Sequence, residues 1–388
     1  MAAMLSNLGT VLLQRYERNG DPQDIDEVVR RNREVLDITD ASSPDRPRFL
    51  ANLCTALHTR FQCTGGFEDL DGAVAAGHDA TATVPSHHPE RPRYLSLLGG
   101  VLTVRFERTG SIADLDDAVV ACQAALDISS AEHPERADYL FQLGAALYRR
   151  YQRTHTRHDF DRALAAHMEG ARADGARPSI RIRAAQAAAS MTGRSDPDLA
   201  ADLLASAVHL LPEVADRRLS RGDQQHAMGK WSGLAGDAAA LALASREGTP
   251  ADRAARALQL IEVGRGVLHS QALDMRSDLA ELRERHPDLA HRFEVLRDEL
   301  DRPMELASLT EPDGQVSAAV RAVDAEEQRR SRADQLQATL GNIRAQDGFA
   351  SFARPPAVSE LLAQATSGPV VSFNVSRDGG VALLLTSV

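Results

Sequence analysis

The chain has 388 residues, a formal net charge of -11 at pH 7 and only 4% aromatic residues. An acidic molecule repels the phosphate backbone, so the charge argues against a nucleic-acid partner. No apolar run reaches the roughly 20 residues that a membrane helix needs, and no charged start with an apolar core marks a secretory signal. With few rings and many small aliphatic residues, the composition favours closely packed helices.

A repeat of 45 residues occupies the first half of the chain. A leucine followed by a small residue, an arginine followed by an aromatic residue, and an Asp-x-Asp triplet all recur with this spacing. The first of these signals stands at Leu8-Gly9, Leu53-Cys54, Leu98-Gly99 and Leu143-Gly144. Four copies in one register predict four structural units within residues 1–174.

Each copy predicts two helices. In the third copy, the apolar residues between Arg91 and Glu107 follow the i, i+3, i+4 spacing of a helix face. A break follows in which Gly110 suits a left-handed helix cap. A second helix begins near Asp114, and the segment Ser129–Pro134 ends it.

The glycines inside the first helices predict close helix packing. A glycine in a helix interior costs about 1 kcal/mol relative to alanine, so its repetition implies a compensating contact. We expect the second helix of each copy to approach at these positions with small residues of its own. The residues assigned to this packing are Gly9, Gly99, Gly144, Ala118 and Ala125.

The rest of the chain divides into three further parts. Residues 175–303 predict diverged helical repeats, and residues 304–352 a linker and the charged helix Ser317–Arg344. Residues 353–388 form a last part, in which Gly368–Val388 predicts a strand, a turn and a second strand. The helices expected in the diverged part are Ile180–Ser190, Pro197–Leu211, Gln224–Ser245, Pro250–Gln271, Leu279–His286 and Leu289–Leu300.

The repeat resembles the tetratricopeptide family. The Leu-Gly pair of the first helix and the pattern Ala118…Ala125-Leu126 of the second match that family's signature, although its period is about 34 residues. A HEAT-like array fits the longer period but its signature is missing. The expected fold is therefore mainly α, an α-solenoid of tetratricopeptide-like helix pairs.

Three segments together resemble the bacterial TPR–CHAT proteins, in which a helical array precedes a caspase- and separase-related CHAT domain. They are the array itself, the segment Ile261–Pro303, and the segment Gly348–Ser376. The resemblance implies that the C-terminal β-hairpin opens an incomplete α/β CHAT domain and that the chain is truncated. Active members are cysteine peptidases with a His–Cys dyad downstream of that hairpin.

None of the three cysteines is expected to be that nucleophile. Cys54, Cys63 and Cys122 lie in the repeats, far upstream of Gly368, and we expect all three to be small buried residues of a protein in the reducing cytoplasm. The chain as given is therefore expected to have no enzymatic activity.

Several motifs suggest chemistry but favour structural roles. "HPER" at His88–Arg91 and His133–Arg136 becomes "SPDR" at Ser43–Arg46, which keeps a helix-entry pattern and loses the histidine. The Asp-x-Asp triplets begin the second helices, where we expect their carboxylates to cap N–H groups.

Three further features are also interpreted as structural. His155 and His158 have no third metal ligand nearby, and Gly264–Gly266 lacks the context of a phosphate loop. Trp231, the only tryptophan, is expected to anchor a core. No cofactor and no metal site are predicted.

Four arginines at the 45-residue spacing leave two interpretations open. They are a possible partner-binding face for an acidic peptide, or they pair with aspartates of the repeats. They are Arg15, Arg60, Arg105 and Arg150.

The function expected from these features is that of a helical-repeat scaffold that binds a protein or peptide partner on the concave face formed by the first helices. It would be the sensor or regulatory part of a CHAT-domain protein. The alternatives are the N-terminal portion of an active CHAT cysteine peptidase, and a scaffold without any connection to a protease.

Overall fold

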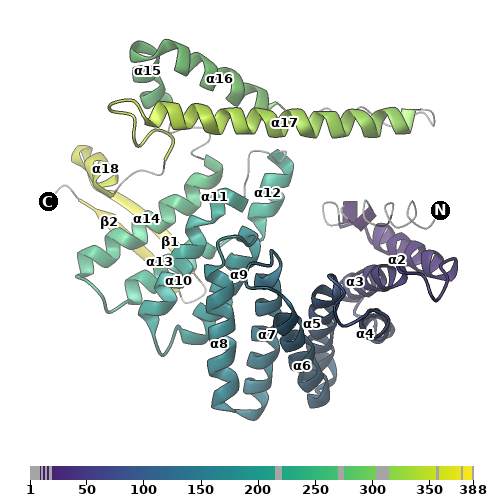
Figure 1. Ribbon diagram of the computed structural model, residues 1–388. Coiled ribbons are helices and arrows are strands. Elements are labelled where there is room, and N and C mark those ends of the chain that lie inside the picture. The colour runs from purple at the N-terminus through teal and green to yellow at the C-terminus, as the bar shows by residue number, and fades with distance from the viewer. Residues whose placement is uncertain are drawn as a thin grey trace. The chain divides into compact units, whose positions relative to one another are not determined.

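The computed structural model describes residues 9, 12, 13, 15 and 16, and then residues 20–386 apart from 215–220, 270–274, 303–313, 355–357 and 377–378. The chain forms two compact units, Met1–Met191 and Thr192–Val388. Figure 1 shows that both units are built mainly from helices and that the strands lie near the C-terminus. The expected mainly helical fold with a short C-terminal hairpin is confirmed at this level.

The helices of the first unit begin at regular intervals. The first helices of successive copies are α3 (Arg46–Thr64), α5 (Arg91–Thr109) and α7 (Arg136–Thr154). The second helices are α2 (Pro22–Asp37), α4 (Phe67–Ala82), α6 (Ile112–Ile128) and α8 (Arg157–Arg172), and α9 (Pro178–Thr192) ends the unit. Within each set, every helix begins 45 residues after the one before it. The first helices, for example, begin at residues 46, 91 and 136.

From α2 to α8, each helix packs against the next along the chain. The first helices also contact one another in succession, α3 with α5 and α5 with α7. Arg149 of α7 donates to Glu107 of α5 at 2.6 Å, and Gln142 lies against the backbone at Gly100. One apolar core runs through the pairs from Leu12 to Met191. The first helices therefore form a continuous row.

The turn inside each helix pair uses a left-handed residue. Gly65 and Gly110 end α3 and α5 with φ of 72° and 74°, which confirms the cap expected at Gly110. The fourth copy places His155 there with φ of 58°. Because side chains disfavour this conformation, the repeated glycine has a backbone reason.

The second unit begins with irregular helices. They are α10 (Pro197–His209), α11 (Leu211–Val214), α12 (Arg221–Gly229), α13 (Leu234–Ala244) and α14 (Pro250–His269). The single helix expected over Gln224–Ser245 is wrong, because Gly233 with φ of 92° divides it into α12 and α13. Trp231 lies in this break and is half-exposed, so it is not the core anchor that we expected.

A group of three helices follows: α15 (Met275–Arg285), α16 (Pro287–Asp301) and α17 (Gly314–Arg344). Its apolar core joins residues of all three helices and is closed by Phe349 and Phe352. The guanidinium of Arg344 donates to the carbonyl of Phe352 at 2.9 Å and so fixes the segment after α17. The charged helix expected here is present, and the preceding linker lies mostly outside the described residues.

The C-terminal segment forms α18 (Val358–Ala363), a 3-10 turn at Gln364–Ser367, and the antiparallel strands β1 (Val370–Ser376) and β2 (Gly379–Leu385). The expected hairpin is thus confirmed, although the Arg377–Asp378 part of its turn lies outside the described residues. Asn374 of β1 donates to the carbonyl of Gly236 in α13 at 2.9 Å. None of the helices that the structure describes has the length and apolar character that crossing a membrane requires.

Candidate binding surface

The four repeated arginines lie at the turns within the helix pairs, each against an aspartate nine residues later. In the fourth copy, Nε and Nη2 of Arg150 both donate to the carboxylate of Asp159 at 2.8 Å. The aspartate is buried, with only 5% of its side chain exposed. The same two-bond pairing recurs at Arg15–Asp24, Arg60–Asp69 and Arg105–Asp114. We call these four pairs the Arg–Asp rungs.

The rungs also connect neighbouring copies. Nη1 of Arg150 reaches Asp116 of the preceding copy at 2.9 Å, and Nη1 of Arg60 reaches Asp26 at 3.1 Å. Arg105 lies 3.7 Å from Asp71 in the equivalent contact. Each of the first three Asp-x-Asp triplets therefore has one aspartate for its own arginine and one for the next, whereas Asp161 of the fourth pairs with Arg157.

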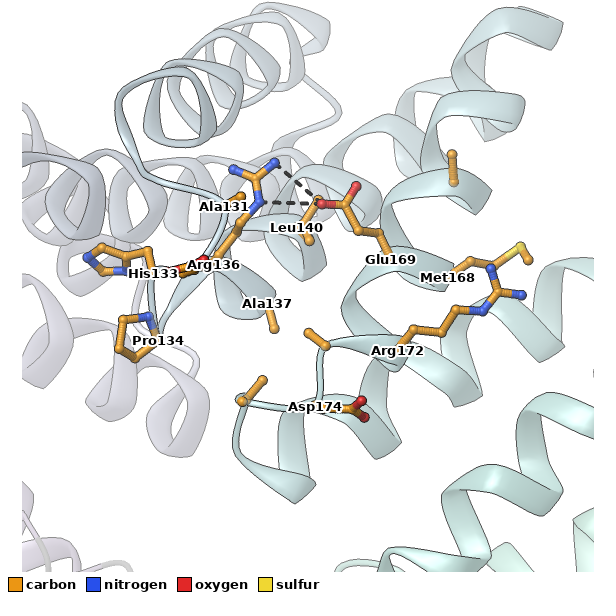
Figure 2. Close-up of a pocket in the computed structure, with 15 residues that line it drawn as sticks. Ala131, His133, Pro134, Arg136, Ala137, Leu140, Met168, Glu169, Arg172 and Asp174 are labelled. Carbon is orange, nitrogen blue, oxygen red and sulfur yellow. Dashed lines mark hydrogen bonds and ion pairs between the residues drawn. The ribbon is translucent and has the colours of Figure 1, made fainter.

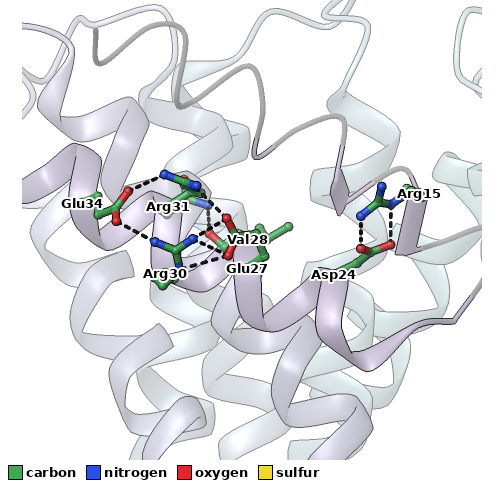
Figure 3. A network of polar contacts seen from close by, with 8 residues as sticks. Arg15, Asp24, Glu27, Val28, Arg30, Arg31 and Glu34 are labelled. Carbon is green, nitrogen blue, oxygen red and sulfur yellow. Dashed lines mark hydrogen bonds and ion pairs between the residues drawn. The ribbon is translucent and has the colours of Figure 1, made fainter. Parts of the chain in front are cut away.

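Figure 3 contrasts a rung with an ordinary surface network on α2. Asp24 lies beneath Arg15, whose bonds hold the pKa of that carboxyl below its usual range. Arg30 and Glu27 instead pair on the exposed side of α2. Because the rung carboxylates accept from arginine, our expectation that they cap helix N–H groups is wrong. An acidic ligand at these arginines would have to displace a buried carboxylate.

The "HPER" phrase joins successive copies. Nδ1 of His88 accepts the N–H of Glu90 at 3.2 Å, and His133 does the same for Glu135. The arginine of the phrase reaches back to the preceding helix: Arg91 donates to the carbonyls of Thr81 and Val84 at 2.7 and 2.9 Å. The phrase thus starts one helix and closes the end of another. The sequence alone did not reveal the arginine's part.

The packing glycines face a residue 23 positions later on the partner helix. A β-carbon on Gly99 would lie 2.2 Å from Sγ of Cys122 and 3.1 Å from the carbonyl of Ala118. On Gly9 it would lie 3.5 Å from Asn32, an ordinary contact. The second copy reverses the arrangement, with Cys54 on the first helix and Gly77 on the second. A β-carbon on Gly77 would lie 3.6 Å from Sγ of Cys54. Ala125 is fully buried in the same core.

In the fourth copy this position holds a histidine. His167 is 2% exposed, and its Nδ1 has no hydrogen-bond partner among the described residues. Its ring lies against Gly144 and 5.5 Å from the ring of Phe141. Burial lowers the pKa of His167 to about 4. The side chain is therefore a neutral, buried packing residue at ordinary pH.

The three cysteines differ in their exposure. Cys54 and Cys122 are buried, and burial raises the pKa of each thiol to about 12. Cys63 is exposed and contacts the hydroxyl of Tyr16, so the expectation that all three cysteines are buried is wrong. Across the described residues, no three His, Cys, Asp or Glu side chains gather in a way that could hold a metal ion.

Two motifs set aside from the sequence have simple places in the structure. His155 follows the end of α7 and His158 lies in the first turn of α8, and both are exposed. Gly264 lies inside α14, where a β-carbon would come within 2.3 Å of that of Ala235. The Gly-Arg-Gly triplet is therefore helical, and its first glycine serves helix packing.

A cavity of about 910 Å³ lies at the opposite end of the fourth helix pair from its rung. Its walls come from the connection before α7, the first turns of α7, the last turns of α8 and the connection to α9. Figure 2 shows Arg136 bonded to Glu169 on one side, with Met168 and Arg172 next to each other on α8. The volume lies within the range typical of ligand sites. Sequence analysis did not identify this cavity.

Comparison with known proteins adds no assignment. No protein-family model matches the chain, and no curated protein is similar to it. The candidate surfaces are therefore the row of first helices and the cavity of the fourth copy.

Proposed function

We propose that the chain is a tetratricopeptide-like helical-repeat scaffold that binds a protein or peptide partner along its row of first helices. The observation that carries the proposal is the succession α3, α5 and α7, in which each first helix contacts the next. No pair of second helices is in comparable contact among the described residues. In a curved stack the helices that lie closer together line the concave side, so the row of first helices is the favoured surface.

Small residues stand at the centre of the row. At its centre stand Thr55, Gly100 and Ala145, which are 45 residues apart and half-buried. We call this line of residues the strip; Gln142 lies against the backbone at Gly100, and Arg149 lies beside the strip, bonded to Glu107. A peptide bound across several repeats would make many weak contacts that together provide its affinity. Repeat proteins bind in this way along their extended surfaces.

We further propose that the array is the regulatory part of a CHAT-domain protein. The hairpin supports this through an unusual placement of its side chains. Ser372 and Asn374 are buried, whereas Val371, Phe373 and Val375 are exposed. An apolar outer face is suited to be covered by a further layer of a larger domain, and two strands alone are marginally stable. The cysteines described above are not catalytic in this proposal.

The binding proposal is tested by selecting peptides from a displayed random library against the full chain and measuring their affinity by titration calorimetry. We expect micromolar binders whose affinity falls when Ala145→Trp fills the strip. Val120→Trp is the matched control, because Val120 is 69% exposed on a second helix, and it should bind normally. Failure to enrich any peptide, or equal binding by both variants, would refute the proposal.

A further inference from the structure

The cavity of the fourth copy stands where the array departs from its own repeat. The connection from α8 to α9 spans residues 173–177, whereas the two preceding connections span residues 83–90 and 129–135. The shorter connection still forms one wall, through Asp174 and Gly175. The surface here is therefore not one that the repeat alone would generate.

The charge of the last turn of the second helix is also reversed here. Arg172 lines the cavity, and its repeat counterparts are Asp37, Ala82 and Asp127. Arg172 is exposed and makes no ion pair or hydrogen bond within the described part of the chain. Asp174, the nearest acid in sequence, pairs with Arg181 at 2.9 Å. The cavity thus contains an arginine without an ion pair among the described residues, although Glu132, Glu169 and Asp174 also line it.

The second arginine of the cavity is held more loosely than its counterparts. Arg46 and Arg91 each donate to two backbone carbonyls at 2.7 to 3.0 Å. Arg136 reaches the carbonyl of Leu126 at 3.3 Å and Oγ of Ser129 at 3.4 Å. Its contacts with Glu169 are 3.3 and 3.4 Å long. Long hydrogen bonds are weak ones, so an incoming carboxylate can compete for this guanidinium.

Part of the wall is apolar, next to Glu169, which pairs with Arg136. Ala137 and Leu140 from α7 and Met168 from α8 line it. Met168 replaces the polar residues Arg33, His78 and Gln123 of the earlier copies. An unbranched thioether adapts to the shape of an apolar ligand. The first turn of α7 also faces the cavity, and the positive end of a helix favours an anion.

We propose that this cavity binds one residue pair of a peptide partner: a large aliphatic side chain next to a carboxylate. The side chain lies against Leu140 and Met168, and the carboxylate is held by Arg172 and Arg136. The inference deepens the proposed function, on which it rests, by naming the chemistry of one anchor. The carboxylate can come from an aspartate or from the C-terminus of a chain.

The test uses the full chain labelled with ¹³C at its methionine methyl groups, with Met168→Leu assigning the Met168 signal. Four short peptides are titrated: an aspartate–leucine amide, an asparagine–leucine amide, a peptide ending in free leucine, and its amide. We expect the Met168 signal to move with the first, the third or both, which identifies the source of the carboxylate. The two uncharged peptides should bind roughly tenfold more weakly.

Three variants locate the site. Arg172→Asp restores the sign of the earlier copies and should weaken binding roughly tenfold, while Arg153→Asp, an exposed charge reversal at the far end of α7, should not. Ala165→Trp should block the cavity. Glu132→Gln removes an acid from the lining and should not weaken binding.

The proposal is wrong if no peptide moves the Met168 signal, if the uncharged peptides bind equally well, or if Glu132→Gln weakens binding and Arg172→Asp does not. Peptides that remain sensitive to Ala145→Trp in that case would leave the proposed function standing and remove only this anchor.

Discussion

The imidazole of His167 occupies the space in which a β-carbon of residue 144 would lie: the three nearest ring atoms are 2.6 to 2.8 Å from that position. Gly144 and His167 are thus a matched pair, as Gly99 and Cys122 are in the third copy. Across the copies, the larger member of the pair changes identity and even changes helix, and the smaller member stays a glycine. Close approach is retained rather than any particular side chain.

This pairing predicts that the glycine and its larger partner can exchange places between the two helices, but that the glycine cannot be lost. Gly99→Cys should lower the free energy of unfolding by about 2 kcal/mol or more, because two side chains would share one space. Adding Cys122→Gly rebuilds the arrangement of the second copy, Cys54 with Gly77, and should recover most of the loss. Urea denaturation of the two variants measures this.

Gly9→Ala is the control for that experiment, since its new methyl group would meet Asn32 at an ordinary distance. It should be tolerated. Helix propensity favours both new residues over glycine, so equal destabilisation by Gly9→Ala and Gly99→Cys would show that the close contact at Gly99 does not explain the loss.

The buried histidine predicts an acid-sensitive component of stability. Its folded-state pKa, about 4, lies below the unfolded value near 6.5, so the unfolded chain binds more protons between these values. Stability from this group is therefore complete above pH 6.5 and is lost as the pH falls toward 4, by about 3 kcal/mol at most. Denaturation at a series of pH values measures the slope.

His167→Cys isolates this effect, because the third copy already holds a cysteine at that position. Its stability should depend less steeply on pH between 4 and 6.5 than that of the parent chain. Identical slopes for the two proteins would contradict the burial of a neutral imidazole.

The Arg–Asp rungs predict a structural cost that surface pairs do not share. Arg105→Leu leaves the buried carboxylate of Asp114 without its partner and should lower the free energy of unfolding by about 2 kcal/mol or more. Arg30→Leu removes an exposed pair on α2 and should change stability little. Thermal unfolding compares them, and a rung variant as stable as the surface variant would argue that the rungs are dispensable.

The three thiols predict a simple chemical pattern. Only Cys63 should react with a disulfide reagent in the native protein at pH 8, because Cys54 and Cys122 are buried and remain protonated. All three should react after denaturation. Rapid native labelling of more than one thiol would contradict the packing described for the repeats.

The sequence predicted the elements whose signals are local. Helix starts at proline, the left-handed Gly110, the charged helix and the final hairpin all follow from short patterns. The sequence did not predict features that depend on the partner of a residue. The direction in which Arg91 turns, the break at Gly233 and the exposure of Cys63 are set by tertiary packing.

The cavity was missed for a related reason. Repeat analysis emphasises the positions that recur, and the cavity is made by residues that do not. Arg172 and Met168 stand out only when each copy is compared with the others at one position. That comparison is possible from sequence alone and identifies these two residues, but the cavity that they line depends on the packing of α7 and α8.

Hydrogen–deuterium exchange of the full chain, with and without a saturating selected peptide, tests the central claim most directly. We expect slowed exchange in the first helices α3, α5 and α7 and unchanged exchange in the second helices α4 and α6. Protection confined to α4 and α6, or to residues 192–388, would contradict a binding surface formed by the row of first helices.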